Sequence, residues 1–167
     1  MRQISNRKLM QTGKKYINKQ SLSYRLKPIN MLRNFSTVVT WILRLLAAVI
    51  MLQTLYFKFT AAPESVYIFS TLGMEPVGRI GIGIMELIAS VLILYPKTTG
   101  IGATLGAGLM SGALFFHLTK LGFIVQDDGG LLFIYALIVF LSCLSLMIIY
   151  RKEILAHTRL NYFFGRH

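Results

Sequence analysis

The chain has 167 residues, of which 54% are apolar and only 14% are charged, with a net charge of +12 and a mean hydropathy of +0.60. An ordinary globular domain carries about 25% charged residues, so this composition argues against a soluble protein. The basic residues gather at the two ends of the chain and flank apolar stretches. That placement indicates membrane topology and anionic lipid headgroups, and it argues against a nucleic-acid partner.

The first 35 residues contain nine Lys and Arg and no Asp or Glu. We interpret them as a basic cytoplasmic tail without fixed structure. They do not form a secretory signal, because the basic stretch is too long and no small-residue cleavage site ends the apolar run that follows. Two alternatives stay open: an organelle transit peptide, and a translation start at Met31, which would remove most of the tail.

Four apolar stretches predict membrane-spanning helices, at residues 36–57, 80–95, 98–119 and 131–150. A crossing needs about 20 mostly apolar residues. The second stretch is long enough only if its glycine-rich start lies in the membrane, or if the bilayer is locally thinner.

Between the first two stretches, Pro63 and Glu64 suit the first turn of a short helix and Gly73 suits its end. This segment is apolar enough to lie on the membrane surface. The predicted fold is therefore all-α: an integral membrane four-helix bundle over residues 36–151, with a short interfacial helix and with basic tails at 1–35 and 152–167.

The distribution of Lys and Arg predicts the orientation, because these residues concentrate on the cytoplasmic side. With both ends inside, the inner side holds the nine in the tail, Lys97 and four after Tyr150, whereas the outer side holds only Lys58, Arg79 and Lys120. We therefore expect a multi-pass protein of the bacterial inner membrane with both termini in the cytoplasm.

The third stretch is rich in small residues, with steps of four at Gly102/Gly106 and Gly108/Gly112. Such steps let helix backbones approach closely. We interpret these four glycines as packing positions within the bundle. A homo-oligomer interface is the alternative.

Several ionisable or polar residues interrupt the apolar stretches, and a charge at mid-bilayer costs about 2.5–3.5 kcal/mol. The helical rise places Gln53, Glu86 and His117 in the outer half of the bundle. Arg44 lies deeper, but its long side chain is expected to reach toward Glu86. The full set of ligand-binding or proton-handling candidates is Glu86, His117, Arg44, Gln53, Tyr56, Lys58, Asp127 and Asp128.

These residues support two interpretations. In the functional one they line a polar cavity open to the outer face, where Glu86 accepts protons or binds a ligand. In the structural one Arg44 and Glu86 form an ion pair, His117 is interfacial, and Asp127 and Asp128 form a turn with the two glycines that follow. The residues alone identify no catalytic group.

The chain lacks the residues that several kinds of chemistry require. Cys143 is the only cysteine, so neither an internal disulfide nor a thiol pair can form. One intramembrane histidine cannot ligate haem from both sides, and the chain has no phosphate-binding or dinucleotide-binding motif. We expect no metal site and no redox centre in this chain.

Three segments carry a family resemblance: residues 42–65, 70–96 and 111–133. Together they resemble the DoxX / DoxX-like family of small four-helix membrane proteins, and Arg44, Lys58, Glu86 and His117 match polar positions of that family. The resemblance implies a non-catalytic membrane subunit of a quinone-linked or thiol/oxidative-stress oxidoreductase complex. It further implies a redox partner protein and a contact with quinone.

Three functions follow from these observations. The first is the membrane subunit of an oxidoreductase, and any enzymatic role would go no further than that. The second is a module that binds or transports a small lipid-like or organic ligand. The third is a membrane scaffold without a site.

Overall fold

The computed structural model describes residues 36–152. The predicted tails at 1–35 and 152–167 fall outside this range, apart from Lys152. The chain divides into two units, Met1–Thr40 and Trp41–His167, and the arrangement described below is that of the second unit. Between residues 36 and 152 the regular structure is entirely helical, as the sequence predicts.

Four helices are long and apolar enough to cross a membrane: Ser36–Phe59, Val77–Leu94, Thr99–Leu121 and Leu131–Ile149. The first is called the N-terminal helix here. The second is α3, and the fourth is α5. The third consists of α4 (Thr99–Phe116) and a π-helical turn, η1 (His117–Leu121). The four predicted spans are confirmed to within three residues at each end, and they make this chain a multi-pass membrane protein.

The short helix α2 (Pro63–Thr71) occupies the predicted place between the first two spans. Pro63 stands at its first position and Glu64 in its first turn. Gly73 follows its end with a φ of 70°, a backbone conformation that glycine adopts without strain. Ser65 and Phe69, four residues apart, form its buried face.

Small side chains allow the long helices to pack closely at the centre of the bundle. Ala47, Ala89, Ala103 and Val139, one from each long helix, are completely buried. Around them lie larger core residues such as Met51 and Ile93. Most of the large aliphatic side chains instead point outward, as expected for surfaces that face lipid.

The four candidate glycines of α4 fall into two pairs. A Cβ on Gly102 would lie 2.5 Å from the backbone nitrogen of Ile93, and one on Gly106 would lie 2.9 Å from the Cys143 sulfur. A Cβ on Gly108 or Gly112 would meet nothing within 4 Å. Only the first pair therefore lies at a tight helix contact within the chain.

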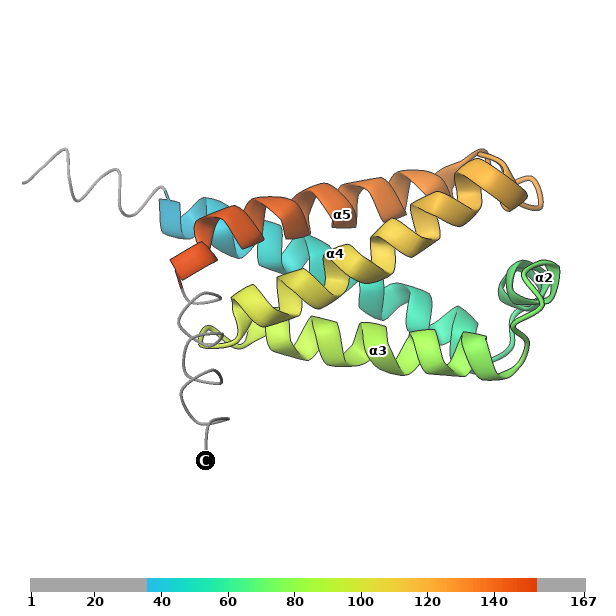
Figure 1. The fold of residues 1–167 in the computed structure, drawn as a ribbon, viewed down its shortest axis with the longest axis horizontal. Helices are drawn as coiled ribbons and strands as arrows, with labels where there is room; N and C mark the ends of the chain where they lie inside the picture. Colours follow the sequence, from blue (N-terminus) through green and yellow to red (C-terminus); the bar gives the residue numbers. More distant parts are fainter. Residues whose placement is uncertain (1–35, 153–167) are drawn as a thin grey trace, which may run out of the picture. The chain divides into compact units, whose positions relative to one another are not determined.

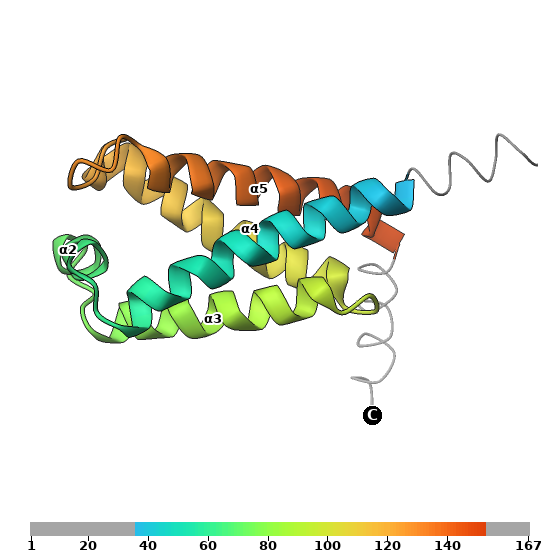
Figure 2. The ribbon, with the colours of Figure 1, turned by 180° about the vertical axis from the view of Figure 1, so that it is seen from behind.

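Helix α2 marks one end of the bundle, called the α2 end below. It contacts both α3 and η1. Figures 1 and 2 show α2 lying between the start of α3 and the connection from α4 to α5. The candidate site lies at this end.

Candidate functional site

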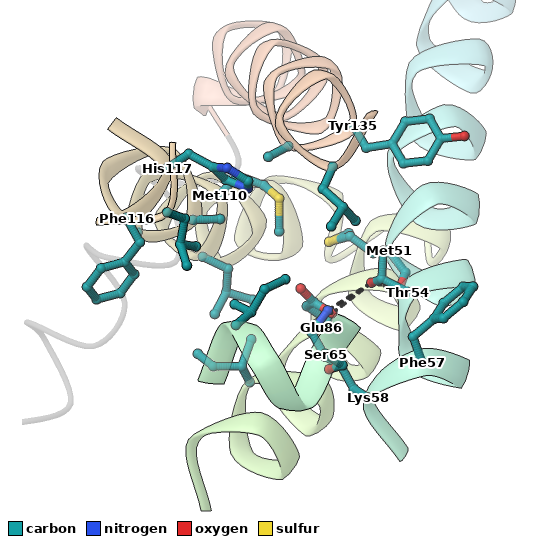
Figure 3. Close-up of a pocket in the computed structure, with 18 of the residues that line it drawn as sticks. Met51, Thr54, Phe57, Lys58, Ser65, Glu86, Met110, Phe116, His117 and Tyr135 are labelled. Carbon is teal, nitrogen blue, oxygen red and sulfur yellow. Dashed lines mark hydrogen bonds and ion pairs between the residues drawn. The ribbon is translucent and has the colours of Figure 1, made fainter. Parts of the chain in front are cut away.

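A buried ion pair joins the N-terminal helix to α3 at the α2 end. The Lys58 Nζ lies 2.8 Å from Glu86 Oε2. The Thr54 hydroxyl, one turn before Lys58, lies 3.1 Å from both of these atoms. The three side chains form one hydrogen-bonded group, drawn in Figure 3.

Arg44 does not approach Glu86, so that expectation is corrected. Side chains of a helix point back toward its N-terminus, which carries Lys58 toward Glu86 and Arg44 away from it. The Arg44 guanidinium donates to the Ile93 carbonyl at 2.8 Å and also to the Leu94 carbonyl, at the C-terminal end of α3. It also lies 4.0 Å from the centre of the Trp41 ring.

One carboxylate oxygen of Glu86 is left free. The residue is only 4% exposed, and its Oε2 takes all of its hydrogen bonds. Within residues 36–152 its Oε1 has no partner, and Figure 3 shows a carboxylate oxygen pointing into the cavity. The Ser65 hydroxyl on α2 also has no partner in this range, although the residue is only 6% exposed.

His117 begins the π-helical turn, a local structure that is frequent at functional sites. Its Nδ1 lies 2.8 Å from the Gly122 carbonyl oxygen. A carbonyl can only accept, so Nδ1 carries the proton, and in the neutral ring Nε2 is an acceptor. This Nε2 has no partner in the described part of the chain, and the ring packs edge-on against Phe133.

Asp128 fixes the loop that leads into α5. Its carboxylate accepts from the backbone N–H groups of Val125, Gly130 and Leu132 at 2.8–3.0 Å. Burial acts to raise the pKa of Asp128, but these three donors and the nearby His117 outweigh it, and the net pKa is lowered. The carboxylate is therefore held in its charged form. The turn predicted at Asp127–Gly130 is present.

Arg79 fixes the backbone beside Lys58. Its guanidinium lies 2.8 Å from Glu75 in an ion pair and donates to the Lys58 carbonyl. From the sequence, Arg79 was predicted only as a flanking charge on the outer side, and Glu75 had no predicted role. Their four-residue spacing across the start of α3 was the available signal.

These groups surround a cavity of about 390 Å³ at the α2 end. Residues from the N-terminal helix, α2, α3, α4, η1 and α5 line it, and most of them are apolar, such as Met51, Phe69 and Met110. Exposed members of the lining, among them Gln53 and Phe57, show that it reaches the surface. The lining residues with polar or ionisable side chains are Gln53, Thr54, Lys58, Glu64, Ser65, Glu86, His117, Asp128 and Tyr135.

Five of the eight candidate residues line this cavity: Gln53, Lys58, Glu86, His117 and Asp128. Three others do not. Arg44 lies at the end of α3, Tyr56 is 69% exposed on the surface, and Asp127 is exposed in the loop. Sequence reasoning missed the roles of Thr54, Glu64, Ser65 and Tyr135 in the lining. Thr54, four residues before Lys58, was the one with a visible signal.

Within residues 36–152, no three His, Cys, Asp or Glu side chains are grouped so that they could hold a metal ion. In comparisons with protein families, curated proteins and solved structures, nothing matches the chain. The resemblance to the DoxX-like family therefore stays a prediction.

Proposed function

We propose that this protein binds a small amphipathic molecule in the cavity at the α2 end. One observation carries the proposal: a largely buried ion pair, Lys58–Glu86, presents a carboxylate oxygen without a partner to a mostly apolar cavity. A polar atom that faces an apolar cavity without a hydrogen-bond partner is costly unless a ligand or water satisfies it. A ligand with an apolar body and a polar head matches both parts of the lining.

The position of the cavity suits a ligand that is dissolved in the membrane. With the predicted orientation, the α2 end faces the outer side of a bacterial inner membrane. Four spans are few for a transporter, so we favour binding over transport in a single copy of the chain.

The test is to purify the protein from membranes of its host in mild detergent and to identify small molecules that co-purify. Wild type is compared with Ala113→Phe, which places a ring where a methyl now lines the cavity. Ile134→Phe, on an exposed position of α5, is the matched control. We expect one bound molecule in wild type and in Ile134→Phe, and none in Ala113→Phe. Equal amounts in all three, or no bound molecule in any, would overturn the proposal.

The predicted role as a subunit of an oxidoreductase, in which the chain would contact quinone, concerns a partner protein as well as the cavity. The same purification tests it, since a redox protein that co-purifies in fixed ratio would support it. The two functions are compatible if the ligand is the reduced form, because a quinol is an amphipathic molecule whose hydroxyl groups can donate hydrogen bonds.

A further inference from the structure

We infer that the ligand of this cavity is a lipophilic amine, a protonated nitrogen attached to an apolar chain or ring. The inference rests on the proposed binding function and names the chemical class of the ligand. Two features of the lining support it: the formal charge of its side chains and the hydrogen-bonding character of its free atoms.

The cavity is acidic in a strongly basic protein. The chain has 18 Lys and Arg but only six Asp and Glu. Three of those six acids, Glu64, Glu86 and Asp128, line the cavity, whereas Lys58 is its only Lys or Arg. With neutral His117 the lining carries a formal charge of −2, in a chain of net charge +12. A low-dielectric cavity of one sign attracts a ligand of the opposite sign.

The free polar atoms of the three buried lining residues, Glu86, Ser65 and His117, can all accept a hydrogen bond. Glu86 Oε1 can only accept, and Nε2 of neutral His117 can only accept. The Ser65 hydroxyl can do both. Glu86, Ser65 and His117 are each at least 94% buried, and no residue between 36 and 152 bonds to these atoms. A ligand that satisfies these buried atoms supplies N–H or O–H donors.

Lys58 does not cancel this preference. Its ammonium donates two of its three N–H groups, one to Glu86 Oε2 and one to Thr54 Oγ1. It thus neutralises one carboxylate but leaves the second oxygen of that carboxylate open. Neither Glu64 at the exposed rim nor Asp128 at the start of α5 forms an ion pair with a Lys or Arg of the described residues. An ammonium near Glu86 would form a charge-assisted bond, whereas an alcohol would form a weaker neutral one.

The test uses the full chain in nanodiscs of zwitterionic lipid, titrated at neutral pH with octylamine, octanol and octanoate. These probes share one chain length and differ in headgroup charge, and empty nanodiscs correct for partitioning into lipid. We expect octylamine to bind about tenfold more tightly than octanol, and octanoate to bind most weakly. Glu86→Gln should remove most of the preference for the amine. Glu64→Gln should reduce the preference for the amine more modestly. This change affects an exposed side chain and leaves the Lys58–Glu86 ion pair intact.

The outcomes separate the two proposals. If octanol or octanoate binds as tightly as octylamine, and Ala113→Phe abolishes that binding while Ile134→Phe does not, the cavity binds ligands but the inferred class is wrong. If Ala113→Phe changes the binding of none of the probes, the proposed function is wrong, and the inferred ligand class is wrong as well. A preference for the amine that is blocked by Ala113→Phe and weakened by either carboxylate variant supports both.

Discussion

Arg44 and Arg79 make the same kind of contact in opposite directions between the N-terminal helix and α3. Arg44 on the N-terminal helix donates to the last carbonyls of α3, Ile93 and Leu94. Arg79 on α3 donates to the Lys58 carbonyl near the end of the N-terminal helix. Helix C-termini carry carbonyls without partners and a partial negative charge, so each cation stabilises the end of the neighbouring helix.

Arg44→Met should destabilise the protein by about 2–3 kcal/mol, because two carbonyls at the end of α3 lose a charged donor that is itself only 2% exposed. Arg44→Lys should lie between Arg44→Met and wild type, since an ammonium keeps the charge but cannot bond to both carbonyls in the fork geometry of arginine. The measurement is the Tm of the purified protein in detergent. Leu45→Met, at a half-exposed neighbour, is the control and should not change the Tm. A Tm of Arg44→Met equal to that of wild type would show that the contact does not stabilise the fold.

The Lys58–Glu86 pair should show strong coupling in a double-mutant cycle. Lys58→Met or Glu86→Met alone leaves one buried charge without its counterion, at a cost of about 3–5 kcal/mol. The double variant should lose clearly less free energy of unfolding than the two single variants lose together. The free energies of unfolding of the four proteins, measured in bicelles, give the coupling. Lys97→Met, which removes an exposed lysine, serves as the control, and simple additivity of the two losses would contradict the predicted pairing.

The sequence predicted the spans well because their signal is local. Length and hydropathy locate each helix without reference to its neighbours. Helix ends are marked by residues that start or stop helices: Pro63, Gly73 and Pro96. Counting the helical rise also brought Gln53, Glu86 and His117 to the same end of the bundle, where they line one cavity.

The depth of each residue in the membrane was not enough to predict which cation pairs with Glu86. Arg44 was expected to reach it, but side chains tilt toward the N-terminus of their helix, so the cation beyond the carboxylate, Lys58, is the one that meets it. A polar cavity was one of the two interpretations of the sequence, but its volume and its mostly apolar lining could not be predicted. It depends on how far the helices separate at the α2 end, and that separation follows from close packing of residues such as Ala89 and Ala103 elsewhere in the bundle.

Gly102→Ala should destabilise the bundle, whereas Gly108→Ala should not. The methyl on residue 102 would overlap the backbone of Leu92 and Ile93, so α3 and α4 must separate, at a cost of about 1–3 kcal/mol. The methyl on residue 108 meets nothing, and alanine favours helix by up to about 1 kcal/mol. The free energies of unfolding of both variants are measured in the same detergent. Equal losses of stability would refute the assignment of a tight contact to residue 102 and not to residue 108. A loss of self-association in Gly108→Ala would instead support the predicted oligomer interface.

Asp128 should make stability depend on pH in the acid range. Its pKa is lowered in the folded protein, so its contribution is complete above the ordinary value of 3.8 and is lost as the pH falls through the folded pKa. Asp128→Asn should cost about 1–2 kcal/mol at neutral pH through the weakened backbone bonds. The difference between wild type and variant should begin to shrink as the pH falls below about 4 and should disappear only below the lowered folded pKa. Asp127→Asn is the control, because Asp127 is exposed and asparagine tolerates its φ of 61° equally well. A difference that does not depend on pH would contradict the role of the charge.

The predicted orientation can be read from cysteine labelling in intact cells. Lys120→Cys lies at the end of η1 and Lys97→Cys lies in the turn between α3 and α4, so the two thiols are at opposite ends of one span. Because Lys and Arg concentrate inside, we expect a membrane-impermeant maleimide to label position 120 in intact cells and position 97 only after permeabilisation. The native Cys143 thiol is fully buried and should stay unlabelled in the parent protein, which makes it an internal control. The reverse pattern would place the cavity on the cytoplasmic side, and its ligand would then have to come from the cytoplasm or the inner leaflet.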